Sequence, residues 1–350
     1  MTDIKEITRL TGFSHGSGCG CKIAPSVLEE ILKGNNIKSD YPGLLVGNES
    51  RDDAAVLELP DGNCLISTTD FFTPVVDDAY DFGRIASANA ISDVYAMGGK
   101  PVLAIAILGW PVDKLPSTVA QQVIAGARAV CEQANIPLAG GHSIDTPEPI
   151  FGLAVNGIVK KNNLKKNNTA QRGDLLFITK PIGTGILSAA LRRNKLSSGD
   201  LKKAVDVMTE LNKAGEEFGS MDGVHALTDV TGFGLLGHLI EMAEGSGLSA
   251  IINYKDVPLI EGIDQYTSQF IFPDSVYRNW NSYQSKVTGI NGPSFITLCD
   301  PQTSGGLLVA VSPTDKERFI KVVRSSGIAV ADYPIGIITE KKDYVIEVIE

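Results

Sequence analysis

Hydrophobic and polar positions divide the first part of the chain into segments with clear strand or helix periodicity. A short apolar run that ends in Ser and Thr predicts a strand at 64–69. The continuous apolar run at 102–108 predicts a buried strand. A helix is predicted at 81–97, where two glycines end it, and another at 117–134, where apolar residues recur along one face. Another apolar run predicts a strand at 150–159.

The pattern breaks at 160–173, which is polar, charged and rich in Asn and has no core periodicity. We expect a linker between two domains there. Strand and helix patterns then resume, with strands predicted at 174–179, 307–311 and 344–349 and helical stretches at 200–219 and 235–243. Because strands and helices alternate on both sides of the linker, the sequence predicts an α/β or α+β protein of two domains.

Composition narrows the class of protein. The chain has 350 residues, 43% of them hydrophobic and 21% charged, which excludes disordered and fibrous classes and allows two cores. Its formal net charge of −10 argues against a broad basic surface for nucleic acid or anionic membrane. The start lacks the apolar core of a secretory leader, and no apolar run approaches the roughly 20 residues of a membrane span. Five cysteines without a paired framework favour a reducing, cytoplasmic compartment.

Acidic residues recur where apolar segments end, most of them beside Thr, Ser or another acid. They are Asp52, Asp53, Asp70, Asp93, Asp229 and Asp300. If several converge, their repulsion requires cations, and carboxylate oxygens suit Mg²⁺ that carries nucleotide phosphates. Each one alone could equally be a helix cap, a turn residue or half of an ion pair. Asn89 and Asp93, four residues apart, are expected on one helix face.

Glycine-rich segments suggest places where a backbone approaches a ligand closely, although simple turns explain each of them equally well. Residues 231–234 lead into an apolar helix, so their N–H groups could face an anion. Residues 140–143 follow a short apolar run and could form a similar phosphate-binding turn. No P-loop or protein-kinase string occurs, so an ATP enzyme of this sequence belongs to neither common class.

The most unusual string is Ser14-His-Gly-Ser-Gly-Cys-Gly-Cys-Lys22. Two cysteines in such a small-residue loop are not expected in the core. A thiol beside Lys22 and near His15 would have a lowered pKa and a raised thiolate fraction. Cys64, Cys131 and Cys299 lie in apolar segments and are expected to be buried and structural.

Taken together, these strings resemble the selenophosphate synthetase (selenide, water dikinase) family. The matching stretches are 14–22, 47–55, 67–72, 89–101, 104–111, 138–157, 228–239 and 300–307. The nucleotide-site strings alone also fit the wider superfamily that includes aminoimidazole ribonucleotide synthetase and thiamine-monophosphate kinase. The Gly-Cys-Gly-Cys-Lys string selects the selenium enzyme.

The resemblance implies a two-domain aminoimidazole ribonucleotide synthetase-like fold. A mobile catalytic segment at 1–22 precedes an N-terminal domain at 23–159, with a mixed sheet and helices, and an α+β domain at 174–350. The implied reaction converts ATP, selenide and water to selenophosphate, AMP and phosphate, with Mg²⁺ required. A homodimer joined through the N-terminal sheets is also implied, with ATP between the domains.

Site residues carry over by position from the family. Cys19 resembles the catalytic residue, and Lys22 resembles the essential lysine that contacts nucleotide phosphates. Asp53, Asp93 and Asp229 match Mg²⁺ ligands. Nucleotide contacts are implied for Lys22, Ser50, Arg51, Asp52, Asp70, Asp93, Gly141, His142 and Ser143.

Two other functions fit parts of the sequence. Another ATP-dependent synthetase or kinase of the superfamily would share the acidic residues and would not need selenide. A thiol-based selenium or metal carrier would use Cys19 and Cys21 and would need neither ATP nor the acidic residues.

Overall fold

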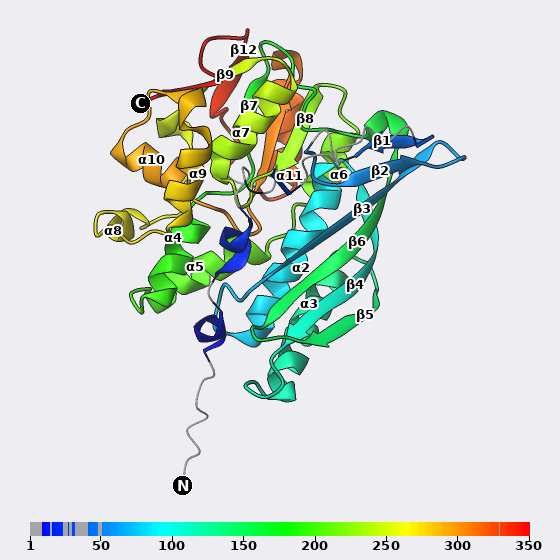
Figure 1. Ribbon diagram of the computed structural model, residues 1–350. Helices are drawn as coiled ribbons and strands as arrows, with labels where there is room; N and C mark the ends of the chain where they lie inside the picture. Colours follow the sequence, from blue (N-terminus) through cyan, green and yellow to red (C-terminus); the bar gives the residue numbers. More distant parts are fainter. Residues whose placement is uncertain are drawn as a thin grey trace.

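The computed structural model places two β-sheets side by side, with helices around and between them (Figure 1). It describes residues 9–14, 16–23, 27, 30–31, 41–47, 51–328 and 330–350. Strands and helices alternate through both halves, which confirms the predicted two-part α/β architecture.

The first half forms a six-stranded sheet in the order β1-β2-β3-β6-β4-β5. Its elements are β1 Leu44–Val46, β2 Ala55–Glu58, β3 Asn63–Phe72, α2 Ala79–Ala96, β4 Lys100–Trp110, α3 Ser117–Gln133, β5 Leu138–Asp145 and β6 Ile150–Lys160. Helix α2 packs over β3 and β6, and α3 packs beside it, on the same face of the sheet. Each predicted element of this half is present, and the ends move by a few residues.

No described helix covers the other face of this sheet (Figure 1), and apolar side chains on that face are exposed. Phe71 on β3 is 51% exposed, and Ile105 on β4 and Ile158 on β6 are 42% and 40% exposed. The prediction that 102–108 is a fully buried strand is therefore wrong, since alternate side chains of β4 face outward. Apolar residues on both faces of a strand are typical of a sheet with both faces covered, and among the described residues the helices cover only one face of this sheet.

Residues 140–143 do not form a turn, contrary to the prediction. They belong to β5, an exposed edge strand that runs parallel to β4. Gly141 pairs with Ala106, and a Cβ atom on Gly141 would lie 2.2 Å from the Ala106 carbonyl oxygen. The glycine therefore allows close strand pairing at this edge.

The second half forms a seven-stranded sheet in the order β10-β13-β9-β12-β7-β11-β8. Its strands are β7 Leu175–Ile178, β8 Val224–Asp229, β9 Ser249–Asn253, β10 Val287–Thr288, β11 Leu307–Val311, β12 Gly336–Thr339 and β13 Ile346–Ile349. Its helices are α4 Thr184–Arg192, α5 Ser198–Thr209, α6 Ala214–Gly219, α7 Gly234–Gly245, α8 Asp264–Thr267, α9 Ser275–Tyr283, α10 Gly292–Leu298 and α11 Lys316–Ser325. Every strand and helix predicted for this half overlaps one of these elements, and the predicted helical stretch 200–219 is divided into α5 and α6.

Burial on both faces explains the uninterrupted apolar run of β11, in which all five residues are buried. One face joins the large core that α7 covers, and the other packs Val309 against Phe319 of α11 in a smaller core. Ala96, at the end of α2, belongs to the smaller core. Helix α2 therefore links the two halves and carries its polar residues into the space between the sheets.

Across the part of the chain that the structure describes, every helix is too short or too polar to cross a bilayer.

Candidate functional site

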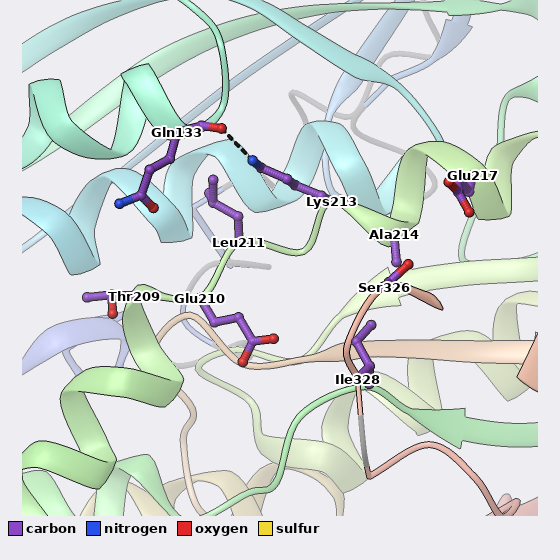
Figure 2. Close-up of a pocket in the computed structure, with 9 residues that line it drawn as sticks. All are labelled: Gln133, Thr209, Glu210, Leu211, Lys213, Ala214, Glu217, Ser326 and Ile328. Carbon is purple, nitrogen blue, oxygen red and sulfur yellow. Dashed lines mark hydrogen bonds between the residues drawn. The ribbon is translucent and has the colours of Figure 1, made fainter. Parts of the chain in front are cut away.

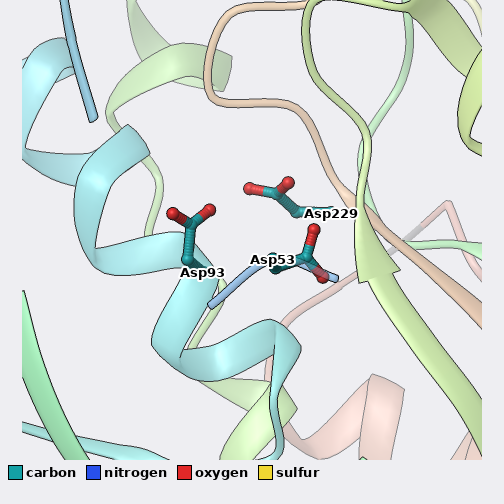
Figure 3. Close-up of side chains that lie close together, drawn as sticks. All are labelled: Asp53, Asp93 and Asp229. Carbon is teal, nitrogen blue, oxygen red and sulfur yellow. The ribbon is translucent and has the colours of Figure 1, made fainter. Parts of the chain in front are cut away.

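Three carboxylates from distant parts of the sequence meet between the two halves (Figure 3). Asp53 lies just before β2, Asp93 is on α2, and Asp229 ends β8. One oxygen atom of each lies within 4.8 Å of the others. We call these three residues the acidic cluster. The predicted convergence of these side chains is therefore present in the structure.

Burial and mutual repulsion make it energetically unfavourable for all three carboxyl groups of the acidic cluster to be ionised without a cation. Burial, with Asp229 nearby, raises the pKa values of Asp53 and Asp93 well above the usual range of a carboxyl. Burial also raises the pKa of Asp229 to about 6. Two charges 4.8 Å apart repel by about 3.5 kcal/mol at an effective dielectric constant near 20. A cation would remove this cost.

The oxygen atoms of the acidic cluster also fit a hard cation. Oδ2 of Asp53 and Oδ2 of Asp229 are buried and have no hydrogen-bond partner. Two other oxygens are oriented, since Thr68 Oγ1 donates to Asp93 Oδ2 at 2.5 Å and Thr228 Oγ1 donates to Asp53 Oδ1 at 2.9 Å. Buried unpaired carboxylate oxygens beside fixed ones are the donor set that Mg²⁺ takes in proteins.

Lys22 and Asp70 lie beside the acidic cluster. Lys22 Nζ is 3.7 Å from Asp70 Oδ2. Although burial favours a neutral amine, Asp70 and the nearby carboxylates raise the pKa of Lys22 above its usual value. The lysine is therefore a fixed positive charge at a site otherwise rich in negative charge.

Asn89 connects the parts of this site, a role that its spacing from Asp93 alone did not assign. Its Nδ2 donates to Asp70 Oδ2 at 2.5 Å, and its Oδ1 accepts from the backbone N of Ser304 at 2.8 Å. The same Oδ1 accepts from Cys19 Sγ at 3.2 Å. The sequence could indicate only that Asn89 and Asp93 share one face of α2. The contacts of Asn89 with Ser304 and Cys19 depend on the tertiary structure.

The two cysteines of the N-terminal string differ sharply in environment. Cys19 is 1% exposed and belongs to the large core, whereas Cys21 is exposed. Burial raises the pKa of the Cys19 thiol, and Lys22 offsets this only in part. The expectations of a loop outside the core and of a lowered thiol pKa are therefore both wrong for Cys19. The thiol is protonated in this arrangement and donates its hydrogen to Asn89.

The loop around Cys19 fits tightly against the second half. Gly18 has a φ of +51°, and a Cβ atom there would lie 2.3 Å from Thr303 Oγ1. The turn at 231–234 lies against the same loop, because a Cβ atom on Gly232 would be 2.7 Å from the Cys19 carbonyl oxygen. The structure thus brings this predicted glycine-rich turn to the thiol and to Lys22.

The remaining predicted residues differ in their distance from the acidic cluster. Asp52 adjoins Asp53, and burial raises its pKa to about 6 despite hydrogen bonds from the backbone N–H groups of Asn167 and Asp53. Arg51 accepts a hydrogen bond at its carbonyl oxygen from Asn167 Nδ2. Ser50 lies outside the described residues.

Gly141, His142 and Ser143 are not gathered with the other predicted residues. Gly141 shares a row across the sheet with Asp70, through Ala106 and Leu153. Because three strand spacings separate them, the two residues are roughly 14 Å apart. A nucleotide contact from β5 therefore requires a ligand that extends along the sheet or a second copy of the chain.

Figure 2 shows a pocket of about 430 Å³ elsewhere on the molecule. Its lining includes Gln133 from α3, Glu210 and Lys213 from the segment between α5 and α6, and Ser326 after α11. Lys213 Nζ donates to the Gln133 carbonyl oxygen, so the basic group in this view is already engaged. The described lining residues include none from the acidic cluster, and the pocket is not the site described above.

Comparison with solved structures identifies the fold. Thiamine monophosphate kinase from Aquifex aeolicus has a TM-score of 0.67 and 17% sequence identity, over 92% of this chain and 96% of that one. Hydrogenase maturation protein HypE, solved in complex with ATP, has a TM-score of 0.63 and 20% identity, over 94% and 89% of the two chains. These similarities confirm the fold that the sequence resemblance implied.

Sequence comparison is more specific. The family of AIR synthase related proteins matches residues 51–159 with its N-terminal domain and residues 171–349 with its C-terminal domain. Selenide, water dikinase from Pseudomonas putida is 55% identical over 99% of this chain and 100% of its own length. The protein of that name from Sulfurimonas denitrificans is 53% identical over 98% and 100%. The chain therefore belongs to the selenide, water dikinase family, on the two-domain framework of the AIR synthase related proteins.

Proposed function

We propose that this enzyme makes selenophosphate from selenide, ATP and water and releases AMP and phosphate. Its relatives of 50–55% identity over nearly the full length carry the name of that activity. The observation that carries the proposal is the buried acidic cluster, which needs cations, next to a lysine and a buried thiol. A thiol carrier would have no use for three converging carboxylates.

Asp53, Asp93 and Asp229 are the proposed ligands of Mg²⁺. The bound ion would neutralise the phosphates and stabilise charge that develops during phosphoryl transfer. Two unpaired buried oxygens and the raised pKa values of all three carboxyls support this assignment.

Lys22 is the proposed phosphate contact, since its charge lies at the edge of the acidic cluster, where phosphates and metal would meet. Ser50, Arg51, Asp52, Asp70 and Asp93 are proposed to contact the nucleotide or its metal. For Gly141, His142 and Ser143, exposure on β5 keeps the backbone available to a nucleotide or to a second copy.

Cys19 is the proposed catalytic residue. Its sulfur lies beside Asn89, one hydrogen bond from Asp70, which in turn faces Lys22. A soft nucleophile such as selenide would be handled next to the place proposed for the phosphates. Because burial raises the pKa of the thiol in this arrangement, we propose that Cys19 reacts after its loop has moved or Lys22 has come closer.

We further propose a cytoplasmic homodimer joined through the outer face of the six-stranded sheet. Exposed Phe71, Ile105 and Ile158 on that face would be buried by a second copy. Five free cysteines support a reducing compartment. Phe71→Lys should convert the dimer to monomers in analytical ultracentrifugation, whereas Tyr333→Lys, at an exposed site of the second half, should not. A monomeric unsubstituted protein would contradict the dimer.

The activity itself is tested by phosphorus NMR of reactions under anaerobic conditions with ATP, Mg²⁺ and selenide. We expect selenophosphate, AMP and phosphate, and none of these above background when selenide is left out. Accumulation of ADP as the final product, with or without selenide, would favour another kinase of the superfamily. Binding of selenium without consumption of ATP would favour the thiol carrier.

A further inference from the structure

The loop that carries Cys19, residues 16–22, is held by arginines from the second half. Arg192 Nη1 donates to the Gly16 carbonyl oxygen at 2.6 Å, and its Nη2 donates to the Ser14 carbonyl oxygen at 3.1 Å. Arg278 Nη2 donates to the Gly20 carbonyl oxygen at 2.6 Å. Arg192 therefore binds the backbone before Cys19, and Arg278 binds the backbone after it. We call residues 16–22 the Cys19 loop.

Further contacts to the Cys19 loop are also made through its backbone. Gly18 N donates to the Thr73 carbonyl oxygen at 3.1 Å, and Cys19 N donates to Thr303 Oγ1 at 3.1 Å. These bonds do not depend on the side chain at position 19. The loop is thus held in place independently of the group that would do the chemistry.

Arg192 is the residue best placed to hold the loop closed. A guanidinium group is planar and can bridge two carbonyl oxygens at once, which a lysine ammonium does less well. Arg192 is the last residue of α4, and the first turn of that helix is fixed by the segment 300–304. Gln302 Oε1 accepts from the backbone N of Gly183 and of Thr184, and Asp300 Oδ2 accepts from Gly185 N.

Segment 300–304 also touches the Cys19 loop directly, through Thr303. Helix α4 and this segment therefore form one support that contacts the loop at two places, Thr303 beneath Cys19 and Arg192 at Gly16. The support belongs to the second half, while Asn89 and Asp70 belong to the first. Closure of the loop over the acidic cluster consequently depends on the two halves being correctly placed.

We propose that Arg192 is a positioning residue that keeps the Cys19 loop closed and so sets how often the Cys19 thiol becomes accessible. Its importance for turnover rests on the proposed role of Cys19, but closure itself can be measured without turnover. The five cysteines supply the probe. Cys19 is buried and Cys21, two residues later, is exposed, while Cys64, Cys131 and Cys299 are buried in the body of the protein.

The experiment compares the alkylation rates of all five cysteines by N-ethylmaleimide, followed by tandem mass spectrometry of the peptides. Each rate is divided by the rate of the same cysteine in urea, which removes differences in intrinsic reactivity. The variants are Arg192→Met and, as a matched control, Arg193→Met. Arg193 directly follows α4 and donates to the carbonyl oxygens of Phe270 and Phe272, not to the loop.

In the unsubstituted protein we expect Cys21 to react much faster than Cys19. Arg192→Met should raise the Cys19 rate by about tenfold or more, as expected from the loss of charge-assisted hydrogen bonds. Cys64, Cys131 and Cys299 should stay protected, and Arg193→Met should change nothing. An unchanged Cys19 rate in Arg192→Met, or equal rates for Cys19 and Cys21 in the unsubstituted protein, would overturn the proposal.

If Arg192→Met exposes all five cysteines, it has unfolded the protein, and Arg192→Lys then decides. That variant keeps the charge and most of the stem but cannot bridge two carbonyls in one plane. It should raise the rate of Cys19 alone, by less than the Met variant does. No change in Arg192→Lys would then count against the proposal. Because no selenide or ATP is present, failure here is separate from failure of the proposed activity.

Discussion

Replacement of Asp229 by Asn should stabilise the metal-free protein and abolish its stabilisation by Mg²⁺. Asp229 is 2% exposed, and its pKa rises from 3.8 to about 6 on folding, mainly through burial. At 1.36 kcal/mol per unit, this rise costs the folded state about 3 kcal/mol at pH 7. An amide of the same shape avoids this cost.

The size of this effect changes with pH in a defined way. A carboxyl whose pKa is raised in the folded state contributes most to stability below pH 3.8, and this contribution is lost as the pH rises through 6. The unsubstituted protein should therefore lose stability relative to Asp229→Asn between pH 3.8 and pH 6. Above pH 6 the difference should be constant at about 3 kcal/mol.

The assay is urea unfolding in EDTA and in saturating Mg²⁺, with Asp206→Asn as the control. Asp206 is an exposed partner of Lys202, so its replacement should cost no more than about 1 kcal/mol. Mg²⁺ should raise the unfolding midpoint of the unsubstituted protein and of Asp206→Asn but not of Asp229→Asn. If Asp229→Asn is the less stable protein in EDTA at pH 7, or if Mg²⁺ stabilises it equally, the reasoning about the acidic cluster is wrong.

Three further predictions concern single residues of the same region. Cys19→Ser should abolish selenide-dependent AMP formation and Cys21→Ser should keep it, because only Cys19 faces Asn89; the reverse pattern would exchange their roles. Lys22→Met should weaken Mg²⁺-dependent nucleotide binding, measured by calorimetry, at least tenfold while circular dichroism stays unchanged, because it removes the charge beside the phosphates. Unaltered binding would exclude the phosphate contact. Burial lowers the pKa of Lys180 to about 8. Between pH 8 and pH 10.5 only the unfolded chain still binds the proton, so the free energy of unfolding of the unsubstituted protein should rise by about 3 kcal/mol relative to Lys180→Met. Parallel stability curves for these two proteins in urea would contradict the lowered pKa.

The sequence alone determined most of the secondary structure. The terminating glycines predicted α2, the helical period of apolar residues predicted α3, and apolar runs predicted β3 and β6, because these signals are local properties of the chain. The family could also be recognised from the sequence, because its motifs around Cys19, Asp53 and Asp229 are short and continuous in the chain. Burial of Cys64, Cys131 and Cys299 followed from their apolar neighbours and is confirmed.

Only the tertiary structure decided which of these parts meet. Local sequence cannot report distances between segments, so the convergence of Asp53, Asp93 and Asp229 became visible only when α2 and β8 were placed side by side. The same holds for β5, whose glycines read as a turn until β4 paired with them. Cys19 is the clearest case. Its small neighbours suggested an exposed, acidic thiol, but packing against Thr303 and Asn89 removes it from water, and burial outweighs the nearby lysine in setting its pKa.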